Sequence, residues 1–138
     1  MQKLHKKTGG FSLVEILIVI TIVAILASIA WPSYQNSVMK SRRTDGKEAL
    51  LSAAAMQEKM YLQTNRYSSD VSDLGGSTSI EGYYTISVTQ AGGNSTFVLT
   101  ATAAGPQVSD SDCTSFTVDH TGRKRSYDSG ATETTDCW

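Results

Sequence analysis

Hydrophobic and polar positions divide the chain into a short basic start, one long apolar run and a polar body. Residues 1–10 carry three lysines and no acidic residue, whereas residues 11–31 contain 17 apolar side chains out of 21 and a single charge, Glu15. About 20 apolar residues in a helix span the ~30 Å hydrocarbon core of a bilayer, and strands rarely exceed about ten residues. The pattern predicts a membrane-length helix over residues 11–31.

The overall composition hides this division. With 138 residues and a formal net charge of −1, the chain suggests one domain and argues against a strongly basic nucleic-acid binder. Residues 33–138 hold nine basic and twelve acidic residues, so the polar body is mildly acidic. Two cysteines are too few for a disulfide-dense small scaffold.

Two simple interpretations of the N-terminus leave Glu15 unexplained. A secretory signal peptide would use the small residues Ser28 and Ala30 before a cut, but the apolar run exceeds the usual length of about 7–15 residues. A plain membrane anchor explains the length, yet an acid inside a membrane helix costs roughly 2.5–3.5 kcal/mol. Glu15 therefore needs a partner, or it reaches the lipid headgroups near the helix end.

The stretch Gly10-Phe11-Ser12-Leu13-Val14-Glu15, behind a lysine-rich leader, resembles the class III signal of type IV prepilins. The resemblance implies that prepilin peptidase cuts after Gly10, that the new amine of Phe11 is methylated, and that the apolar segment is retained. It also implies that Glu15 meets the Phe11 amine of a neighbouring subunit. Opposite charges attract strongly at low dielectric and each alone is penalised, so this pair would set the axial register of assembly.

Beyond the apolar run, the sequence predicts that the helix continues. Pro32 would end a globular helix, but in the resembled family a proline at this place kinks a helix that goes on. Residues 37–64 contain no proline and many good helix formers. We therefore expect a helix over about residues 11–63, with Pro32 and Gly46 as its flexible points. Its expected packing face holds four apolar residues at helical spacing: Ala49, Ala53, Met56 and Met60.

Short alternating segments follow a polar loop over residues 64–81. Strands are predicted over residues 82–90 and 96–103, around Phe116 and Val118, and over residues 123–127, with turns at residues 91–95 and 120–122. The fold class is therefore α+β, with the long helix, kinked near Pro32, packed on a four-stranded antiparallel sheet, which is the pilin αβ-roll. The predicted organisation is a leader over residues 1–10, a membrane and filament-core helix over 11–32 and a head domain over 33–138.

Cys113 and Cys137 bracket the C-terminal region. In a domain outside the cytoplasm the default is one disulfide, and closing a loop of this size gives roughly 3.5 kcal/mol in the chain-entropy model. The alternative is two free thiols in a reducing compartment. The pattern also resembles the disulfide-bounded C-terminal region of pilins.

Catalytic and metal-binding patterns are absent from the sequence. The two histidines, His5 and His120, have no Cys or His neighbours at metal-binding spacing. Asp110 and Asp112 supply oxygens, but they lack the loop and closing glutamate of a calcium site. We therefore expect no enzyme activity, no cofactor and no metal.

Two groups of basic residues are candidate contact sites. Arg42 and Arg43, with Lys40 and Lys47, are expected to form a solvated helix face or to contact filament neighbours; lipid headgroups or DNA are the alternatives. Arg123, Lys124 and Arg125 could touch DNA phosphates. As successive strand residues they would point to alternate faces, which argues against a single patch.

The resemblance implies a structural subunit of the type IV pilus. Shorter stretches, among them residues 41–50, 65–67 and the final Cys137-Trp138, are similar to PilE-type minor pilins. Such a subunit would prime pilus assembly and support twitching motility, adhesion or DNA uptake. Two alternatives stay open: a pseudopilin of a type II secretion system, and a DNA-binding receptor pilin for natural transformation.

The expected partners are other pilins in a helical filament, prepilin peptidase and an inner-membrane assembly platform. Nucleic acid is a further partner only under the receptor alternative. The expected location is the inner membrane, crossed once with the C-terminal domain in the periplasm, and then the extracellular pilus.

Overall fold

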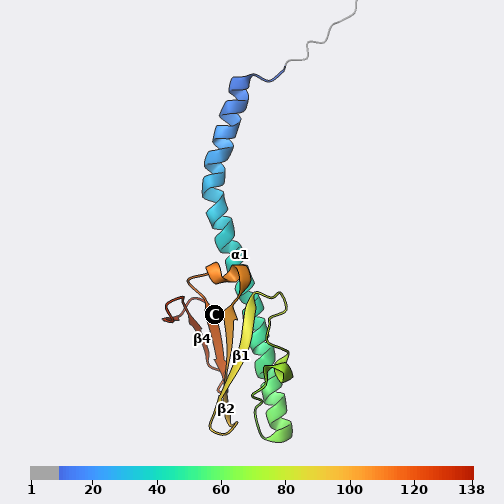
Figure 1. Ribbon diagram of the computed structural model, residues 1–138. Coiled ribbons are helices and arrows are strands. Elements are labelled where there is room, and N and C mark those ends of the chain that lie inside the picture. Colours follow the sequence, from blue (N-terminus) through green and yellow to red (C-terminus); the bar gives the residue numbers. More distant parts are fainter. Residues whose placement is uncertain (1–9) are drawn as a thin grey trace, which may run out of the picture. The chain divides into compact units, whose positions relative to one another are not determined.

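The computed structural model describes residues 10–138, which form one long helix and a five-stranded antiparallel sheet (Figure 1). His5 and the lysines of the predicted leader lie outside the described residues. The chain divides into two compact units, the first ending at Ser37 and the second comprising Val38–Trp138. The elements in chain order are α1 (Leu13–Thr64), η1 (Val71–Leu74), β1 (Tyr84–Ala91), β2 (Thr96–Ala103), η2 (Gly105–Ser109), β3 (Ser115–Asp119), β4 (Lys124–Tyr127) and β5 (Glu133–Thr134).

The first unit consists of the N-terminal part of α1. By length and composition, α1 is the one helix in residues 10–138 that is able to cross a membrane. Its polar hydroxyls are satisfied locally, because Thr21 donates to the carbonyl of Leu17 and Ser28 to that of Ile25, each at 2.7 Å. The helix runs through Pro32 without interruption, so the predicted continuation is confirmed, while the kink stays a prediction.

In the second unit, α1 buries a narrow face that overlaps the predicted one in part. Its buried residues are spaced three and four apart: Arg43, Gly46, Leu50, Ala53 and Gln57. Of the predicted stripe, Ala53 is buried and Ala49 and Met60 pack partly buried against the core, but Met56 is 40% exposed. The prediction followed apolar side chains, whereas two positions of the true face are polar and hydrogen-bonded.

The sheet has the order β1-β2-β3-β4-β5, with every neighbouring pair antiparallel. Its buried face supplies most of the core, which α1 completes with Leu50 and Ala53: Tyr84, Ile86, Phe97, Leu99, Ala101, Phe116 and Val118. The four predicted strands are confirmed. The fifth, β5, was missed because a two-residue strand shows no alternation.

Gly46 marks the closest approach of α1 to the sheet. A Cβ added at this position would lie 2.7 Å from Cγ of Tyr84, and Tyr84 is itself fully buried. Real Cβ atoms do not approach that closely, so the side chain of Tyr84 requires a glycine here. The prediction that Gly46 is a flexible point of the helix is therefore wrong, since it is a packing position.

We expect Gly46→Ala to lower the free energy of unfolding by about 1–3 kcal/mol, the usual cost of overpacking a core. At an ordinary position inside a helix, replacing glycine by alanine would raise the free energy of unfolding by up to about 1 kcal/mol. Denaturant unfolding of the mature chain in detergent, followed by near-UV circular dichroism, measures the change. Ser52→Ala on the exposed side of α1 is the control and should stay within about 0.5 kcal/mol. A more stable Gly46→Ala protein would contradict the packing role.

Candidate functional site

Three residues that the prepilin resemblance assigns to processing and assembly lie at the start of the first unit. Gly10 and Phe11 are exposed and precede the first helical residue, Leu13. Glu15 lies in the first turn of α1, and its carboxylate forms no hydrogen bond or ion pair with any other residue of the range 10–138. Its carboxylate is therefore available to a group on another chain, which the predicted register role requires.

Arg43 forms a buried, two-pronged ion pair that ties α1 to the segment before β3. Its Nε and an Nη donate to the two carboxylate oxygens of Asp110 at 2.6 and 2.7 Å. Both residues are at most 9% exposed, and Gln107 donates a further bond to Asp110 at 2.9 Å. The hydrogen bond to Asp110 raises the pKa of Arg43, against the opposing effect of burial.

This geometry corrects the expectation for Arg43 and describes the setting of Asp110. Arg43 is not an exposed basic contact, because its guanidinium is buried against Asp110. Asp110 is not a calcium ligand with free oxygens, because both of its oxygens accept hydrogen bonds from protein side chains. No group of three or more side chains suited to a metal occurs in residues 10–138.

Asp45 fixes the loop that leads into β1. Its carboxylate accepts hydrogen bonds from the hydroxyl of Ser79 at 2.6 Å and from the backbone N–H groups of Glu81 and Tyr83 at 3.0 and 3.2 Å. Arg42, on the same side of α1, places its guanidinium 4.6 Å from the ring centroid of Tyr83. Neighbouring residues of α1 thus contact two different parts of the chain. Arg43 binds Asp110, whereas Arg42 and Asp45 contact the loop before β1.

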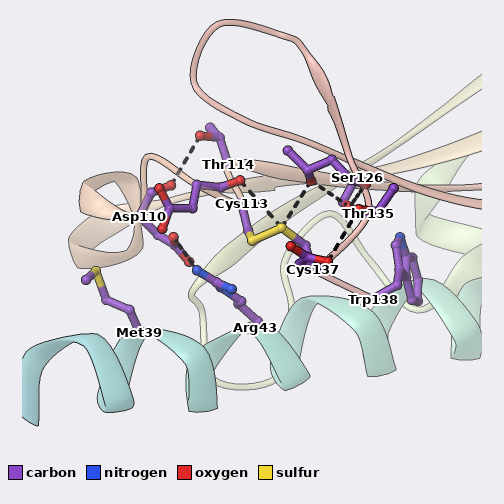
Figure 2. Close-up of a disulfide and its surroundings, with 12 residues drawn as sticks. Met39, Arg43, Asp110, Cys113, Thr114, Ser126, Thr135, Cys137 and Trp138 are labelled. Atoms are coloured by element: carbon purple, nitrogen blue, oxygen red, sulfur yellow. Dashed lines mark hydrogen bonds and ion pairs between the residues drawn. A yellow bond between two sulfur atoms is a disulfide. The ribbon is translucent and has the colours of Figure 1, made fainter. Parts of the chain in front are cut away.

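A disulfide between Cys113 and Cys137 closes the C-terminal region, with the two Cα atoms 5.9 Å apart (Figure 2). Both cysteines are buried. Cys113 follows Asp110 closely in the chain, so the disulfide and the Arg43–Asp110 pair hold neighbouring points of the same segment. The cross-link also brings the last residue, Trp138, against β4, where its indole N–H donates to the carbonyl of Arg125 at 2.5 Å.

Two lysines from distant parts of the chain lie close to the ring of Trp138. The ammonium of Lys47, on α1, lies 5.9 Å from the ring centroid of Trp138 and 5.5 Å from that of Phe116. The ammonium of Lys124, on β4, lies 5.1 Å from the Trp138 ring. Burial, and then the charges of Arg43 and Lys124, lower the pKa of Lys47. We call Lys47 and Lys124 the lysine pair.

The other basic residues near β4 lie in a different setting. Lys124 is paired in register with Val118, whose side chain is buried beneath the helix, whereas Arg125 is paired with Thr117 and belongs to the opposite face of the sheet. A hydrogen bond to Tyr127, and then the charge of Glu133, raise the pKa of Arg125. Arg123 is exposed just before the strand. The expected alternation between faces is confirmed for Lys124 and Arg125, whereas Arg123 lies outside the strand, contrary to the expectation.

Ion pairing distinguishes the lysine pair from Arg43 and Arg125. Within the part of the chain that the structure describes, the ion pairs are Arg43–Asp110 and a looser Arg125–Glu133 contact of 3.9 Å. Neither member of the lysine pair therefore has a carboxylate partner. The sequence pointed to Lys47 and Lys124 separately but could not bring them together, because Trp138 lies beside both only in the folded chain.

Residues 32–117 match the family model described as "Type IV minor pilin ComP, DNA uptake sequence receptor", and residues 5–31 match that of the prokaryotic N-terminal methylation motif. The chain belongs to the type IV minor pilin family. The model names ComP, whereas the shorter sequence stretches suggested the PilE-type group.

Curated relatives of this type IV minor pilin are fimbrial proteins. It is 37% identical over 106 residues to the fimbrial protein of Neisseria meningitidis serogroup A, covering 73% of this chain and 58% of the relative. It is 31% identical over 93 residues to fimbrial protein EcpC of Eikenella corrodens, covering 67% and 61%. The chain therefore spans about three fifths of the length of these relatives.

A solved structure has the same fold. The type IV pilin from Shewanella oneidensis superposes with a TM-score of 0.55 at 24% identity, over 72% of this chain and 97% of that one. The predicted α+β pilin fold is confirmed, with five strands in place of four.

We expect Arg43→Met to destabilise the head strongly, by about 3–5 kcal/mol, because it leaves the buried carboxylate of Asp110 without its counter-ion. Adding Asp110→Leu removes both charges and should recover most of the loss. Denaturant unfolding of the two variants and the wild type measures both effects. A double variant no more stable than Arg43→Met would show that the unpaired charge is not the cause.

Proposed function

We propose that the mature chain is a minor subunit of a type IV pilus that binds duplex DNA on its head during DNA uptake. The match of residues 32–117 to a family described as a DNA uptake sequence receptor carries this proposal. The structure adds basic side chains without carboxylate partners, the lysine pair, as a means of contacting phosphates. Lys124 and Trp138 lie beyond the matched residues, so this surface supports the proposal independently.

The remaining sequence expectations extend this proposal to the life of the subunit. Cleavage after Gly10 exposes the amine of Phe11, and residues 11–32 hold the chain in the inner membrane with the head, residues 33–138, in the periplasm. Assembly then packs these helices in the filament core beside other pilins, with Glu15 meeting a neighbour's Phe11 amine. The methylation motif supports the processing step. Priming of assembly, twitching motility and adhesion are further roles of a minor pilin, and no contact described above favours one of them.

The pseudopilin alternative receives less support. The family model and the curated relatives named above are pilins or fimbrial proteins. Recovery of the chain in sheared surface filaments, rather than in a secretion complex, separates the two.

We expect Glu15→Ala to be processed and inserted in the membrane but poorly incorporated into pili, because the Phe11 amine then lacks its counter-charge at low dielectric. Sheared pili and membranes from cells expressing the variant are compared by immunoblot. Intact mass should show that both wild type and variant begin at methylated Phe11. Failure of Glu15→Ala to insert in the membrane would show that the register role is wrong.

We expect the purified mature protein in detergent to bind a short fluorescent duplex, with an affinity that falls about tenfold from ~50 to ~200 mM salt if two phosphates are contacted. Fluorescence anisotropy titrations at several salt concentrations measure this dependence. A related pilin of the same net charge that is not a DNA receptor is the control. Absence of binding at low salt would refute the proposed function.

A further inference from the structure

We propose that Lys47 and Lys124, held on the ring of Trp138, contact the phosphate backbone of the bound DNA and read no base. This inference rests on the proposed function and assigns the DNA-contacting role to two residues of the head. It excludes Arg43 and Arg125 from the DNA contact, although the sequence analysis grouped them with Lys47 and Lys124 as candidate contact residues.

The first argument is that the lysine pair is an accumulation of like charge with no internal anion. Both ammonium groups lie within the ~6 Å at which a cation is attracted to an aromatic face. Among residues 10–138 neither takes part in an ion pair, whereas Arg43 and Arg125 both do. A phosphate bound near these two charges would relieve their repulsion, and it would not have to displace a carboxylate.

The second argument is that the pair is assembled from rigid parts. Lys47 projects from the middle of α1 and Lys124 from the start of β4, while the Trp138 indole is fixed by its bond to the Arg125 carbonyl and by edge-to-face packing on Phe116, with ring centroids 5.6 Å apart. Less side-chain freedom is lost when an anion binds to lysines that are already restrained.

The same restraint argues for phosphate rather than base recognition. A lysine ammonium is a compact point charge without the planar fork with which arginine recognises guanine. Side chains held against an aromatic ring also do not extend into a groove. Contacts to phosphate fix the position of a duplex but carry no sequence information, so any sequence preference of this pilin must arise elsewhere on the head.

The experiment compares Lys47→Gln and Lys124→Gln in the mature chain, in detergent, with two short duplexes of unrelated sequence. Each variant should bind both duplexes about five- to tenfold more weakly and reduce the slope of log affinity against log salt by about 1. Lys59→Gln is the matched control. It removes the same charge from an exposed position of α1 twelve residues away, roughly 18 Å along the helix, and should bind as wild type.

Two further variants separate contact from folding. Lys47→Arg and Lys124→Arg keep the charge and should retain most of the affinity, and all variants should unfold at similar denaturant concentrations. If the lysines serve only to stabilise Trp138, the glutamine variants will lose stability while their salt slope stays that of the wild type, and the inference is wrong.

The remaining outcomes distinguish the inference from the function on which it rests. Wild-type binding that persists in both glutamine variants overturns the inference and leaves the proposed function standing. Loss of binding to only one of the two duplexes overturns the claim that the lysines read no base. A wild-type protein that binds neither duplex refutes the proposed function and this inference together.

Discussion

The head depends on how closely α1 approaches the sheet at Gly46. Because this residue has no side chain, the helix backbone lies against the ring of Tyr84, and the neighbouring turns are brought within reach of the sheet and its loops. One turn earlier, Arg43 reaches Asp110; one turn later, Leu50 is fully buried in the core. A bulkier residue at the contact would move the helix outward and lengthen all of these interactions at once.

The polar contacts around this point do more to place segments than to stabilise them. Replacing a buried ion pair by apolar residues of similar size is often neutral or stabilising, while breaking one is costly. The Arg43–Asp110 pair is therefore best understood as a constraint on position, since it selects the arrangement in which η2 and the following cysteine lie beside α1. Gln57 acts similarly further along the helix, where its amide makes two bonds of 2.7 Å to the backbone of Ser68.

The sequence predicted the parts of this protein that repeat a local pattern, and it failed where a single long-range contact decides. The alternation of apolar and polar residues was sufficient to predict strands β1 to β4. The length of the apolar run was sufficient to predict the helix of the first unit. The buried face of α1 was predicted only in part, because Arg43 and Gln57 occupy core positions through partners 67 and 11 residues away in the chain. Gly46 was predicted to be flexible because the residue that requires a glycine there, Tyr84, lies on another element and is not visible from the local sequence.

The same limitation applies to what net charge says about the proposed DNA binding. Nine basic and twelve acidic residues make residues 33–138 acidic on average, and an average of this kind disfavours a polyanion. Attraction to a phosphate at close range depends instead on which charges are already neutralised nearby, because exposed charges more than about 10 Å apart are largely screened at ordinary salt. Arg43 is cancelled by Asp110, and Arg125 is partly offset by Glu133, whereas Lys47 and Lys124 meet at an aromatic ring without an acid between them. The fold thus brings two lysines without ion-pair partners to one aromatic ring of an acidic domain, and the disulfide next to Trp138 is part of that arrangement.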